Sequence, residues 1–200
     1  SYFQTLLGKI YYTFPGESSP EAGDLSDWSE KLIGAFRLFY IDASSASDNH
    51  VPLFEVYDCD NESCEFFEDL INPKTNKFKP KVEKAIGEIA SGLGNNTLLI
   101  DHLGLVPEYR GQNIGLHVLF HIIERFSLGA CLIGIKPYPF KFNEIQMKGD
   151  EIYWFGDDDE YIPEPAEIKG LEKYYGKVGF KKIPGSNFMA LATGYILEKI

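Results

Sequence analysis

The stretch LLIDHLGLVPEYRGQNIGLHVLFHIIERF, residues 98–126, determines the fold that the sequence predicts. Residues 97–106 are mostly apolar and predict a strand, which Pro107 ends. Residues 114–126 place their apolar side chains at helical spacing and predict an amphipathic helix. Residues 130–135 are a short apolar run that predicts a second, buried strand. A strand, a helix and a strand in this order predict a parallel pair joined by a right-handed crossover.

Weaker signals on both sides of this unit predict further strands and two more helices. Runs rich in Tyr, Phe and β-branched residues predict strands at residues 8–14, 31–41, 51–58, 180–183 and 188–193, with 31–41 and 51–58 paired as a hairpin. The other segments are expected to form helices at 81–93 and 167–177, a turn at 42–49, a polar connector at 61–80 and a loop-rich segment at 141–165. The predicted fold class is α/β, a mixed central sheet with antiparallel flanks and covering helices, in one domain over residues 1–200.

The composition is that of an ordinary globular protein with an excess of acidic residues. Hydrophobic residues make up 44% of the 200 positions and charged residues 24%, which excludes a wholly disordered chain. A net charge of −11 argues against a general nucleic-acid binder and favours cationic partners, and the apolar runs are too short to span a membrane. We expect a cytoplasmic protein with reduced cysteines and no nucleic-acid or membrane partner, although a Cys59–Cys64 disulfide remains an alternative.

The turn between the central strand and its helix is a candidate anion site. About four backbone N–H groups at the start of a helix lack partners within it, and they point outward with the positive end of the helix dipole. Gly111 and Gly115 let an anion approach the backbone, Asn113 tolerates an unusual dihedral, and Arg110 supplies a positive charge. Neither the GxGxxG dinucleotide fingerprint nor a P-loop occurs in the sequence. A plain capped turn that binds no ligand remains the alternative.

Two motifs resemble signatures of the GNAT superfamily of acetyl-CoA-dependent N-acetyltransferases. VPEYRGQNIG, residues 106–115, resembles the acyl-CoA signature, an Arg/Gln-x-x-Gly-x-Gly/Ala loop that follows a strand. YYGKVGF, residues 174–180, resembles the second signature, an aromatic-Tyr-x-Lys-x-Gly-Phe segment that closes a helix. Asn113 departs from the family's usual Gly, Ile168 stands where the family often has Asn, and the segment 141–169 is longer than usual.

The resemblance implies a GNAT-like acyl-CoA N-acyltransferase fold with acetyl-CoA as co-substrate and no metal. In the family, the pantetheine arm pairs with the main chain of the strand before the loop, where the sheet splays, and Gly104 is expected to permit a bulge there. Backbone N–H groups of the loop hold the pyrophosphate. The residues expected to contact the cofactor are Leu103, Gly104, Leu105, Val106, Arg110, Gly111, Gln112, Asn113, Ile114, Gly115 and Leu116.

The resemblance also implies direct attack of a neutral amine on the thioester. An alkyl amine with a pKa of about 10 is mostly protonated at neutral pH, so a base is useful. Asp101 stands where the family often has a carboxylate, and we favour it over His102, because successive strand residues face opposite sides. Tyr175 matches the tyrosine that protonates the leaving thiolate, and the N–H of Leu105 is expected to meet the oxyanion.

Purely structural roles for these residues remain open. Tyr174 and Tyr175 could simply pack the end of a helix, and Asp101 could serve only to hydrogen-bond a neighbouring strand. His117 and His121 are spaced like two metal ligands on one helical face, but they fall on the polar face and are expected to meet solvent.

The predicted function is transfer of an acetyl group from acetyl-CoA to a primary amine. The acceptor is a small-molecule or peptide amine. The acidic run 157–160 is expected to be a solvated loop, with attraction of a cationic acceptor as the alternative. Two other functions stay open, a non-catalytic acyl-CoA-binding or regulatory module and a plain α/β interaction protein. The final strands could pair between the subunits of a homodimer.

Overall fold

A mixed sheet runs through the computed structural model, which describes residues 1–15, 28–87, 95–139, 144–148, 151–155 and 162–193. Within these residues the sheet has six strands in the order β1-β2-β5-β6-β10-β9. They are β1 (Phe3–Pro15), β2 (Trp28–Ile41), β5 (Thr97–Leu105), β6 (Leu132–Ile135), β9 (Lys181–Lys182) and β10 (Met189–Ala192). β5 and β6 are parallel, and the other neighbouring strands pair antiparallel.

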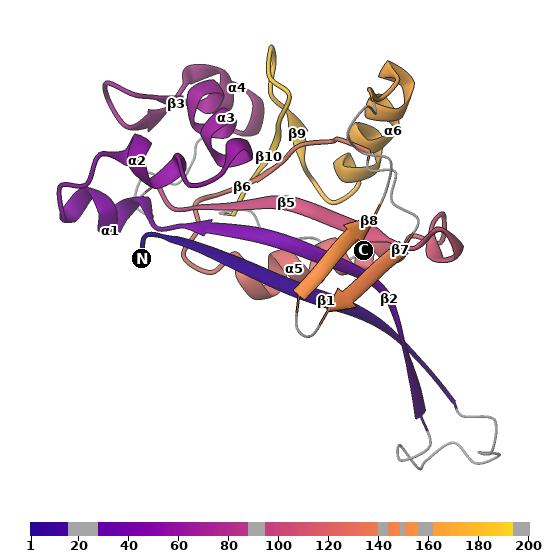
Figure 1. The fold of residues 1–200 in the computed structure, drawn as a ribbon. Coiled ribbons are helices and arrows are strands. Elements are labelled where there is room, and N and C mark those ends of the chain that lie inside the picture. Colours follow the sequence, from indigo (N-terminus) through magenta and orange to yellow (C-terminus); the bar gives the residue numbers. More distant parts are fainter. Residues whose placement is uncertain (16–27, 88–94, 140–143, 149–150, 156–161, 194–200) are drawn as a thin grey trace.

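Helices pack on both faces of this sheet (Figure 1). Four helices follow β2 and are drawn in purple shades in Figure 1. They are α1 (Ala43–Asp48), α2 (Leu53–Tyr57), α3 (Asn61–Leu70) and α4 (Pro80–Ile86), and a small hairpin of β3 (Ile71–Asn72) and β4 (Lys77–Phe78) lies between α3 and α4 in the sequence. The opposite face is covered by α5 (Ile114–Phe126), and α6 (Pro165–Gly176) contributes side chains to the same cluster. A separate antiparallel hairpin consists of β7 (Glu144–Lys148) and β8 (Glu151–Phe155). Among the described helices, none has the length and apolar character that crossing a membrane requires.

Alternation along the strands divides the core into two layers. In β5, Leu99 belongs to the cluster that includes α1–α4, whereas Leu98 and Ile100 belong to the cluster that includes α5, because successive strand residues point to opposite faces. Leu119 and Ile122 of α5 are at most 2% exposed, so burial of an apolar stripe holds this helix on the sheet. Packing from both sides fixes β5 and therefore the turn that follows it.

The α/β class and the strand–helix–strand unit predicted from residues 98–126 are confirmed. The helix α5 has the predicted bounds, and β5 begins at the predicted residue and pairs with β6 in parallel. The antiparallel flanks are also present, since β1, β2 and β5 pair antiparallel and so do β6, β10 and β9.

The segment directly after β2 differs from the prediction. Residues 42–49 form α1 rather than only a turn, and residues 51–58 contain α2 rather than a strand, so the hairpin expected between 31–41 and 51–58 is wrong. β2 pairs with β1 instead. The cause lies in local signals, since the Asp42 side chain accepts a hydrogen bond from the N–H of Ser45 at 3.0 Å and caps α1.

Two further segments contain more regular structure than expected. Residues 61–80, predicted as a polar connector, hold α3 and the β3–β4 hairpin, and α3 is capped by Asp60, whose side chain accepts from Glu62 N at 2.9 Å. Residues 141–165, predicted to be loop-rich, contain the β7–β8 hairpin. The helix predicted at 81–93 ends at Ile86 before a Gly87 with φ of 85°, and residues 88–94 lie outside the described residues.

Candidate functional site

β5 separates from β6 halfway along its length, and the gap between them forms the candidate site. The parallel pairing joins Thr97–Ile100 to Leu132–Ile135 and ends there, while β5 continues beside β2 to Leu105. Pro137 follows two residues after β6 and lacks the N–H that a longer ladder would use. The parallel pairing therefore ends before residues 103–106, where the resemblance implied that the sheet splays.

A bulge at Asp101 interrupts β5 where the gap begins. The residues before and after Asp101 pair with consecutive residues of β2, so Asp101 has no counterpart in that strand. We expected a bulge at Gly104, but Gly104 stays in register with β2. The bulge brings successive side chains together, because the imidazole of His102 contacts the Asp101 carboxylate and both residues line one cavity. The expectation that only one of the two could face the cleft is therefore wrong.

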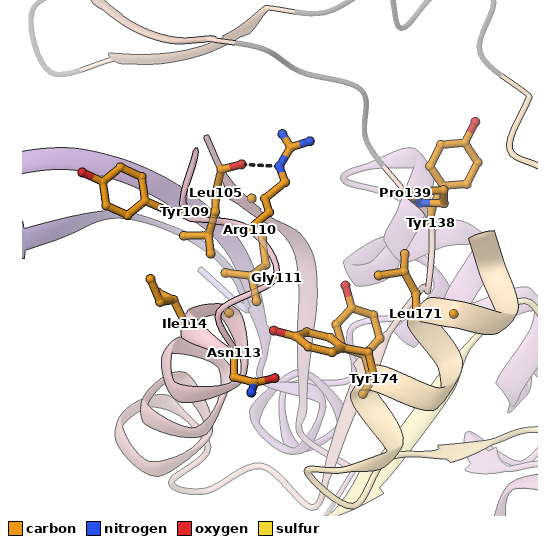
Figure 2. Close-up of a pocket in the computed structure, with 15 residues that line it drawn as sticks. Leu105, Tyr109, Arg110, Gly111, Asn113, Ile114, Tyr138, Pro139, Leu171 and Tyr174 are labelled. Atoms are coloured by element: carbon orange, nitrogen blue, oxygen red, sulfur yellow. Dashed lines mark hydrogen bonds between the residues drawn. The ribbon is translucent and has the colours of Figure 1, made fainter. Parts of the chain in front are cut away.

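The main chain of β5 beyond the bulge presents hydrogen-bonding groups to the gap. Val106 N donates to Ile33 O at 2.9 Å, and antiparallel residues alternate between those that face the partner strand and those that face away. By this alternation, the N–H and C=O groups of Leu103 and Leu105 point away from β2. Arg110 Nε donates to the carbonyl of Leu105 at 2.7 Å (Figure 2). The N–H of Leu105, the expected oxyanion donor, therefore points toward the gap.

A cavity of about 450 Å³ lies between β5, the start of α5 and α6. Figure 2 shows its lining, which consists of Leu103, Gly104, Leu105, Tyr109, Arg110, Gly111, Asn113, Ile114, Gly115, Tyr138, Pro139, Gly170, Leu171, Tyr174 and Tyr175. Residues of both sequence motifs meet there, although α5, β6 and a long connection separate the motifs along the chain.

The turn into α5 carries a run of backbone N–H groups beside this cavity. Gly111 has φ of 76° and Asn113 has φ of 61°, both left-handed conformations, which glycine adopts freely and asparagine more readily than most residues. Asn113 is also the N-cap residue, and its side chain makes no capping hydrogen bond. Among the described residues, the N–H groups of residues 111–115 have no acceptor. The turn therefore has donors and a positive helix end available to an anion.

Tyr174 reaches from α6 to the first turn of α5 (Figure 2). Its hydroxyl oxygen is 2.9 Å from the position that a Cβ on Gly115 would take, so only glycine leaves full room for it. Lys177 lies over the Tyr174 ring, with its Nζ 5.7 Å from the ring centroid. Tyr174 thus closes one side of the cavity and links its two walls.

Tyr175 is the buried tyrosine of the pair, with only 7% of the residue exposed. Among the described residues, the Tyr175 hydroxyl has no hydrogen-bond partner. Every fully buried side-chain nitrogen or oxygen atom in the described residues has a partner, so the Tyr175 hydroxyl is not fully buried. Because Tyr175 lines the cavity, its hydroxyl is open to the cavity. Burial raises the pKa of Tyr175 far above its usual value. The hydroxyl therefore stays protonated at neutral pH and can donate to a ligand.

A second cavity, of about 190 Å³, shares Tyr138 with the first one. Its other lining residues are Glu62 of α3, Asp101 and His102 of β5, and Lys136, which directly follows β6. Both cavities lie along the part of β5 that no longer pairs with β6. Asp101 and His102 line the smaller cavity, and the next three residues of the same strand line the larger one.

Asp101 is an ionised carboxylate held by two partners. Its side chain is 3% exposed and forms an ion pair with Arg37 as well as the contact with His102. Burial alone would raise the pKa of Asp101, but the hydrogen bonds from His102 and Arg37 outweigh burial and hold it below its usual value. Because an ionised carboxylate only accepts, Nδ1 of His102 carries a proton, and the lone pair of the neutral imidazole is at Nε2.

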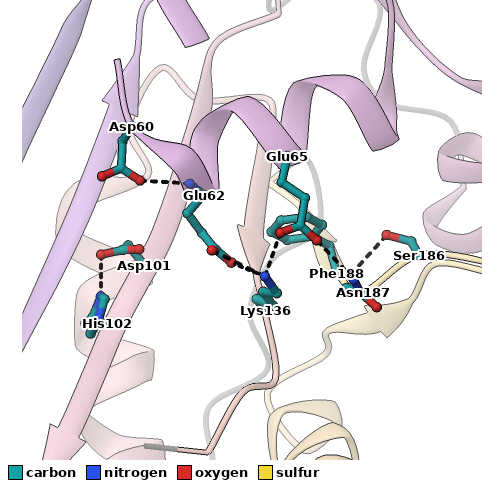
Figure 3. Close-up of polar contacts among 9 residues, drawn as sticks. All are labelled: Asp60, Glu62, Glu65, Asp101, His102, Lys136, Ser186, Asn187 and Phe188. Atoms are coloured by element: carbon teal, nitrogen blue, oxygen red, sulfur yellow. Dashed lines mark hydrogen bonds and ion pairs between the residues drawn. The ribbon is translucent and has the colours of Figure 1, made fainter. Parts of the chain in front are cut away.

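Lys136 lies between two glutamates of α3 (Figure 3). Its Nζ is 3.0 Å from Oε1 of Glu62 and 2.6 Å from Oε2 of Glu65. Burial alone would lower the pKa of Lys136, but hydrogen bonds to the two carboxylates outweigh it and raise the pKa. The pKa of Glu62 is raised by burial, and Lys136 offsets this rise only in part.

Most residues predicted to contact the cofactor line the larger cavity, and Val106, Gln112 and Leu116 are the exceptions. The predicted acid Tyr175 lines that cavity, whereas Asp101 and His102 line the smaller one. Sequence reasoning missed the contributions of Tyr138 and Pro139 after β6, of Gly170 and Leu171 on α6, and of Glu62 and Lys136 in the smaller cavity. A usable signal was the position of residues 136–139 directly after a strand parallel to β5.

The remaining candidate groups line neither of the two cavities or lie outside the described residues. His117 and His121 are exposed on α5, and His121 pairs with Glu124 at 3.3 Å. Across the described ranges, no group of three or more His, Cys, Asp or Glu side chains could hold a metal ion. Cys59, Cys64 and Cys131 are free thiols, so the Cys59–Cys64 disulfide is not formed. The acidic run 157–160 lies outside the described residues.

Comparison of the chain with models of protein families, with curated proteins and with solved structures finds no match.

Proposed function

We propose that the protein is an acetyl-CoA-dependent N-acetyltransferase of GNAT-like fold that transfers an acetyl group directly to a primary amine. One observation carries this proposal: the open edge of β5, the start of α5 with Gly111 and residues 113–115, and Tyr175 line one cavity. These are the groups to which the resemblance assigns the pantetheine arm, the pyrophosphate and the leaving thiolate. The motif pattern and the cavity are separate observations, and they support the same ligand.

The polar groups of the larger cavity suit successive parts of the cofactor. The pantetheine arm contains amide groups, which would pair with the main chain of Leu103 and Leu105 as an added strand does. The pyrophosphate would accept hydrogen bonds from the N–H groups of residues 111–115, at the positive end of α5. Arg110, held to Leu105 through its Nε, adds a positive charge at this end.

We assign the base to His102 and an orienting role to Asp101. The ion pair with Arg37 and the contact with His102 stabilise the charged form of Asp101, so this carboxylate is a weak proton acceptor. The same carboxylate fixes the tautomer of His102 and stabilises the imidazolium that forms when Nε2 takes a proton. This arrangement reverses the order of preference that strand alternation gave.

The chemical step needs two more groups, which lie on the cofactor side. The amine nitrogen attacks the thioester carbonyl, and the oxyanion that develops would accept a hydrogen bond from the N–H of Leu105. Collapse of this intermediate breaks the C–S bond. The hydroxyl of Tyr175 would then donate a hydrogen bond to the departing thiolate. Because the pKa of a thiol, about 8.5, lies below that of the buried phenol, proton transfer to sulfur would be coupled to proton return toward Tyr175.

Two measurements on the intact chain test the proposal. Calorimetry with acetyl-CoA is expected to show binding at one site, and acetyl-cysteamine, which has the thioester but no pyrophosphate, is expected to bind far more weakly. Thiol release is then measured across a panel of primary amines. Acetyl-CoA binding without thiol release would favour the non-catalytic acyl-CoA-binding module, and lack of any acetyl-CoA binding would overturn both assignments.

A further inference from the structure

We infer that the acceptor is a slender aliphatic amine with a second positive charge and no carboxylate, that is, a short diamine or polyamine, bound in the smaller cavity at Glu62 and His102. This inference rests on the proposed function for its chemistry. It concerns a separate cavity, however, whose charge and size are independent of the cofactor.

Among the described residues, the charges around the smaller cavity leave an excess of one carboxylate. Glu62, Glu65 and Asp101 supply three negative charges, and the two permanent cations among their partners are Arg37 and Lys136. Arg37 is paired with Asp101, and Lys136 is shared between Glu62 and Glu65 at 3.0 and 2.6 Å. Glu62 is half-buried and shares its counter-ion with Glu65, so the site favours a ligand that brings a further positive charge.

The reacting nitrogen cannot be the source of that charge. An amine attacks a thioester only through its free electron pair, so its ammonium proton must leave before the C–N bond forms. If the acceptor had one amino group, its positive charge would pass with the proton to His102, and none would remain on the acceptor beside Glu62. A second ammonium group beside Glu62 keeps its charge when the first nitrogen, placed near His102, gives up its proton.

The same contacts disfavour acceptors that carry a carboxylate. Each cation at the smaller cavity already has carboxylate partners. The carboxylate of an amino acid would raise the excess negative charge to two without gaining an unshared cation among the described residues. The volume of about 190 Å³, less than half of the 450 Å³ of the cofactor cavity, suits a slender chain better than a folded peptide.

The proposed step is balanced in atoms and protons. The diamine enters as a dication, and one nitrogen gives a proton to Nε2 of His102. That nitrogen forms a bond to the acetyl carbon, and it loses its second proton to solvent as the C–S bond breaks, while Tyr175 protonates the thiolate. Proton return from His102 toward Tyr175, directly or through solvent, leaves CoA thiol, the monoacetylated diamine and one proton released overall.

A matched series of three amines tests the inference. Putrescine, butylamine and γ-aminobutyrate share a four-carbon chain and differ at the far end, which carries an ammonium, a methyl group or a carboxylate. Putrescine is expected to have a kcat/KM at least about tenfold above that of butylamine, with γ-aminobutyrate lowest. Tenfold corresponds to about 1.4 kcal/mol, a modest value for one buried charge contact. Calorimetry with each amine and no cofactor measures binding to the cavity alone.

Two variants on one helix locate the effect. Glu62→Gln removes a carboxylate that lines the cavity and is expected to raise the KM for putrescine about tenfold while changing that for butylamine little. Glu68→Gln removes an exposed carboxylate of α3 that does not line the cavity, and it is expected to leave both values unchanged. A circular dichroism spectrum and a melting temperature for each variant exclude unfolding as the cause.

The outcomes separate this inference from the proposed function. If butylamine or γ-aminobutyrate is acetylated as well as putrescine, the diamine assignment is wrong and the acetyltransferase assignment stands. If acetyl-CoA does not bind, the proposed function fails, and putrescine binding by the cofactor-free protein then decides the inference. Even in a protein that does not bind acetyl-CoA, equal calorimetric affinity for putrescine and butylamine would overturn the diamine inference.

Discussion

At the scale of single residues, the contrast between Tyr174 and Tyr175 is the sharpest feature of the site. The two are adjacent in sequence and line one cavity, yet the hydroxyl of Tyr174 lies against Gly115 while that of Tyr175 is open to the cavity. Adjacent helix positions point in directions about 100° apart, so one tyrosine packs against α5 and its neighbour faces the gap. Their contributions can therefore be measured separately.

Replacing Tyr175 with Phe removes the hydroxyl and little else. We expect kcat to fall by about a hundredfold, since general acid catalysis contributes about that much or more, while the dissociation constant of acetyl-CoA stays nearly the same. Tyr174→Phe serves as the matched change, and we expect it to affect acetyl-CoA affinity more than kcat. Steady-state kinetics and calorimetry on both variants give the comparison. Unchanged turnover in Tyr175→Phe would remove this residue from the mechanism.

The contacts of Asp101 with His102 and Arg37 make the free energy of unfolding depend on pH. Its pKa is lower in the folded chain than in the unfolded one, because His102 and Arg37 stabilise the carboxylate despite burial. Such a group stabilises the fold fully above its unfolded pKa of about 3.9 and loses this effect as pH falls through its lower folded pKa. The folded carboxylate therefore contributes to stability at neutral pH and ceases to do so in acid.

The substitution Asp101→Asn tests this linkage. We expect the free energy of unfolding at neutral pH to fall by about 2 kcal/mol, the order of a hydrogen bond to a charged group. Below about pH 4, the difference in the free energy of unfolding between the variant and the unsubstituted protein should shrink, because Asp101 of the unsubstituted protein becomes protonated. Urea titrations at several pH values measure the free energy of unfolding of both proteins. As a control, Asp48→Asn replaces an exposed carboxylate, and its free energy of unfolding should stay within about 0.5 kcal/mol of that of the unsubstituted protein. A difference that is constant down to pH 2 would contradict the assignment.

Residue-level predictions succeeded where the sequence pattern is local. The left-handed backbone at Asn113 could be anticipated from the residue type and its place before a helix. The shared orientation of Asp101 and His102 could not be anticipated, because it depends on a bulge in the pairing of β5 with β2. The register of two strands cannot be read from the sequence of either strand alone. Lys136 and Glu62 meet only because β6 and α3 are brought together by the fold.

At the scale of elements, the separation of β5 from β6 creates the site. Elements with strong periodicity were predictable, as the bounds of α5 show. α2 was not, because its residues favour a strand by type and only the burial of Leu53, Val56 and Tyr57 at i, i+3 and i+4 reveals a helix. Signals for short elements are weak, since few residues contribute and tertiary packing decides the outcome.

Hydrogen exchange tests whether the open edge of β5 receives the pantetheine arm. In the free protein, the N–H of Leu105 and that of Leu103 are expected to exchange quickly, because they point toward the gap, whereas that of Leu99 lies within the closed sheet and is protected. Saturating acetyl-CoA is expected to slow exchange at Leu103 and Leu105 at least about tenfold and to leave Leu99 unchanged. Binding without protection at these two positions would mean that the arm lies elsewhere.

At the scale of the whole molecule, the charge of −11 would act on the two proposed substrates in opposite directions. A field of this sign repels acetyl-CoA, whose phosphates are anionic, and attracts a diamine. The cofactor therefore needs its local donors, the free N–H groups of residues 111–115 together with Arg110, to bind against the global field. The acceptor gains from the same field before it reaches the cavity.

Ionic strength separates these two effects. Raising it from about 0.01 M to about 0.15 M shortens the screening length from about 30 Å to about 8 Å, so long-range steering is lost while contacts within the cavities persist. We expect kcat/KM for putrescine to fall several-fold over this range and that for butylamine, which carries one positive charge fewer, to fall less. The association rate of acetyl-CoA should rise or stay constant, because screening removes repulsion rather than attraction. Stopped-flow binding and steady-state rates at matched pH give both trends, and a fall in the association rate of acetyl-CoA would show that a local positive surface, rather than the net charge, governs its encounter.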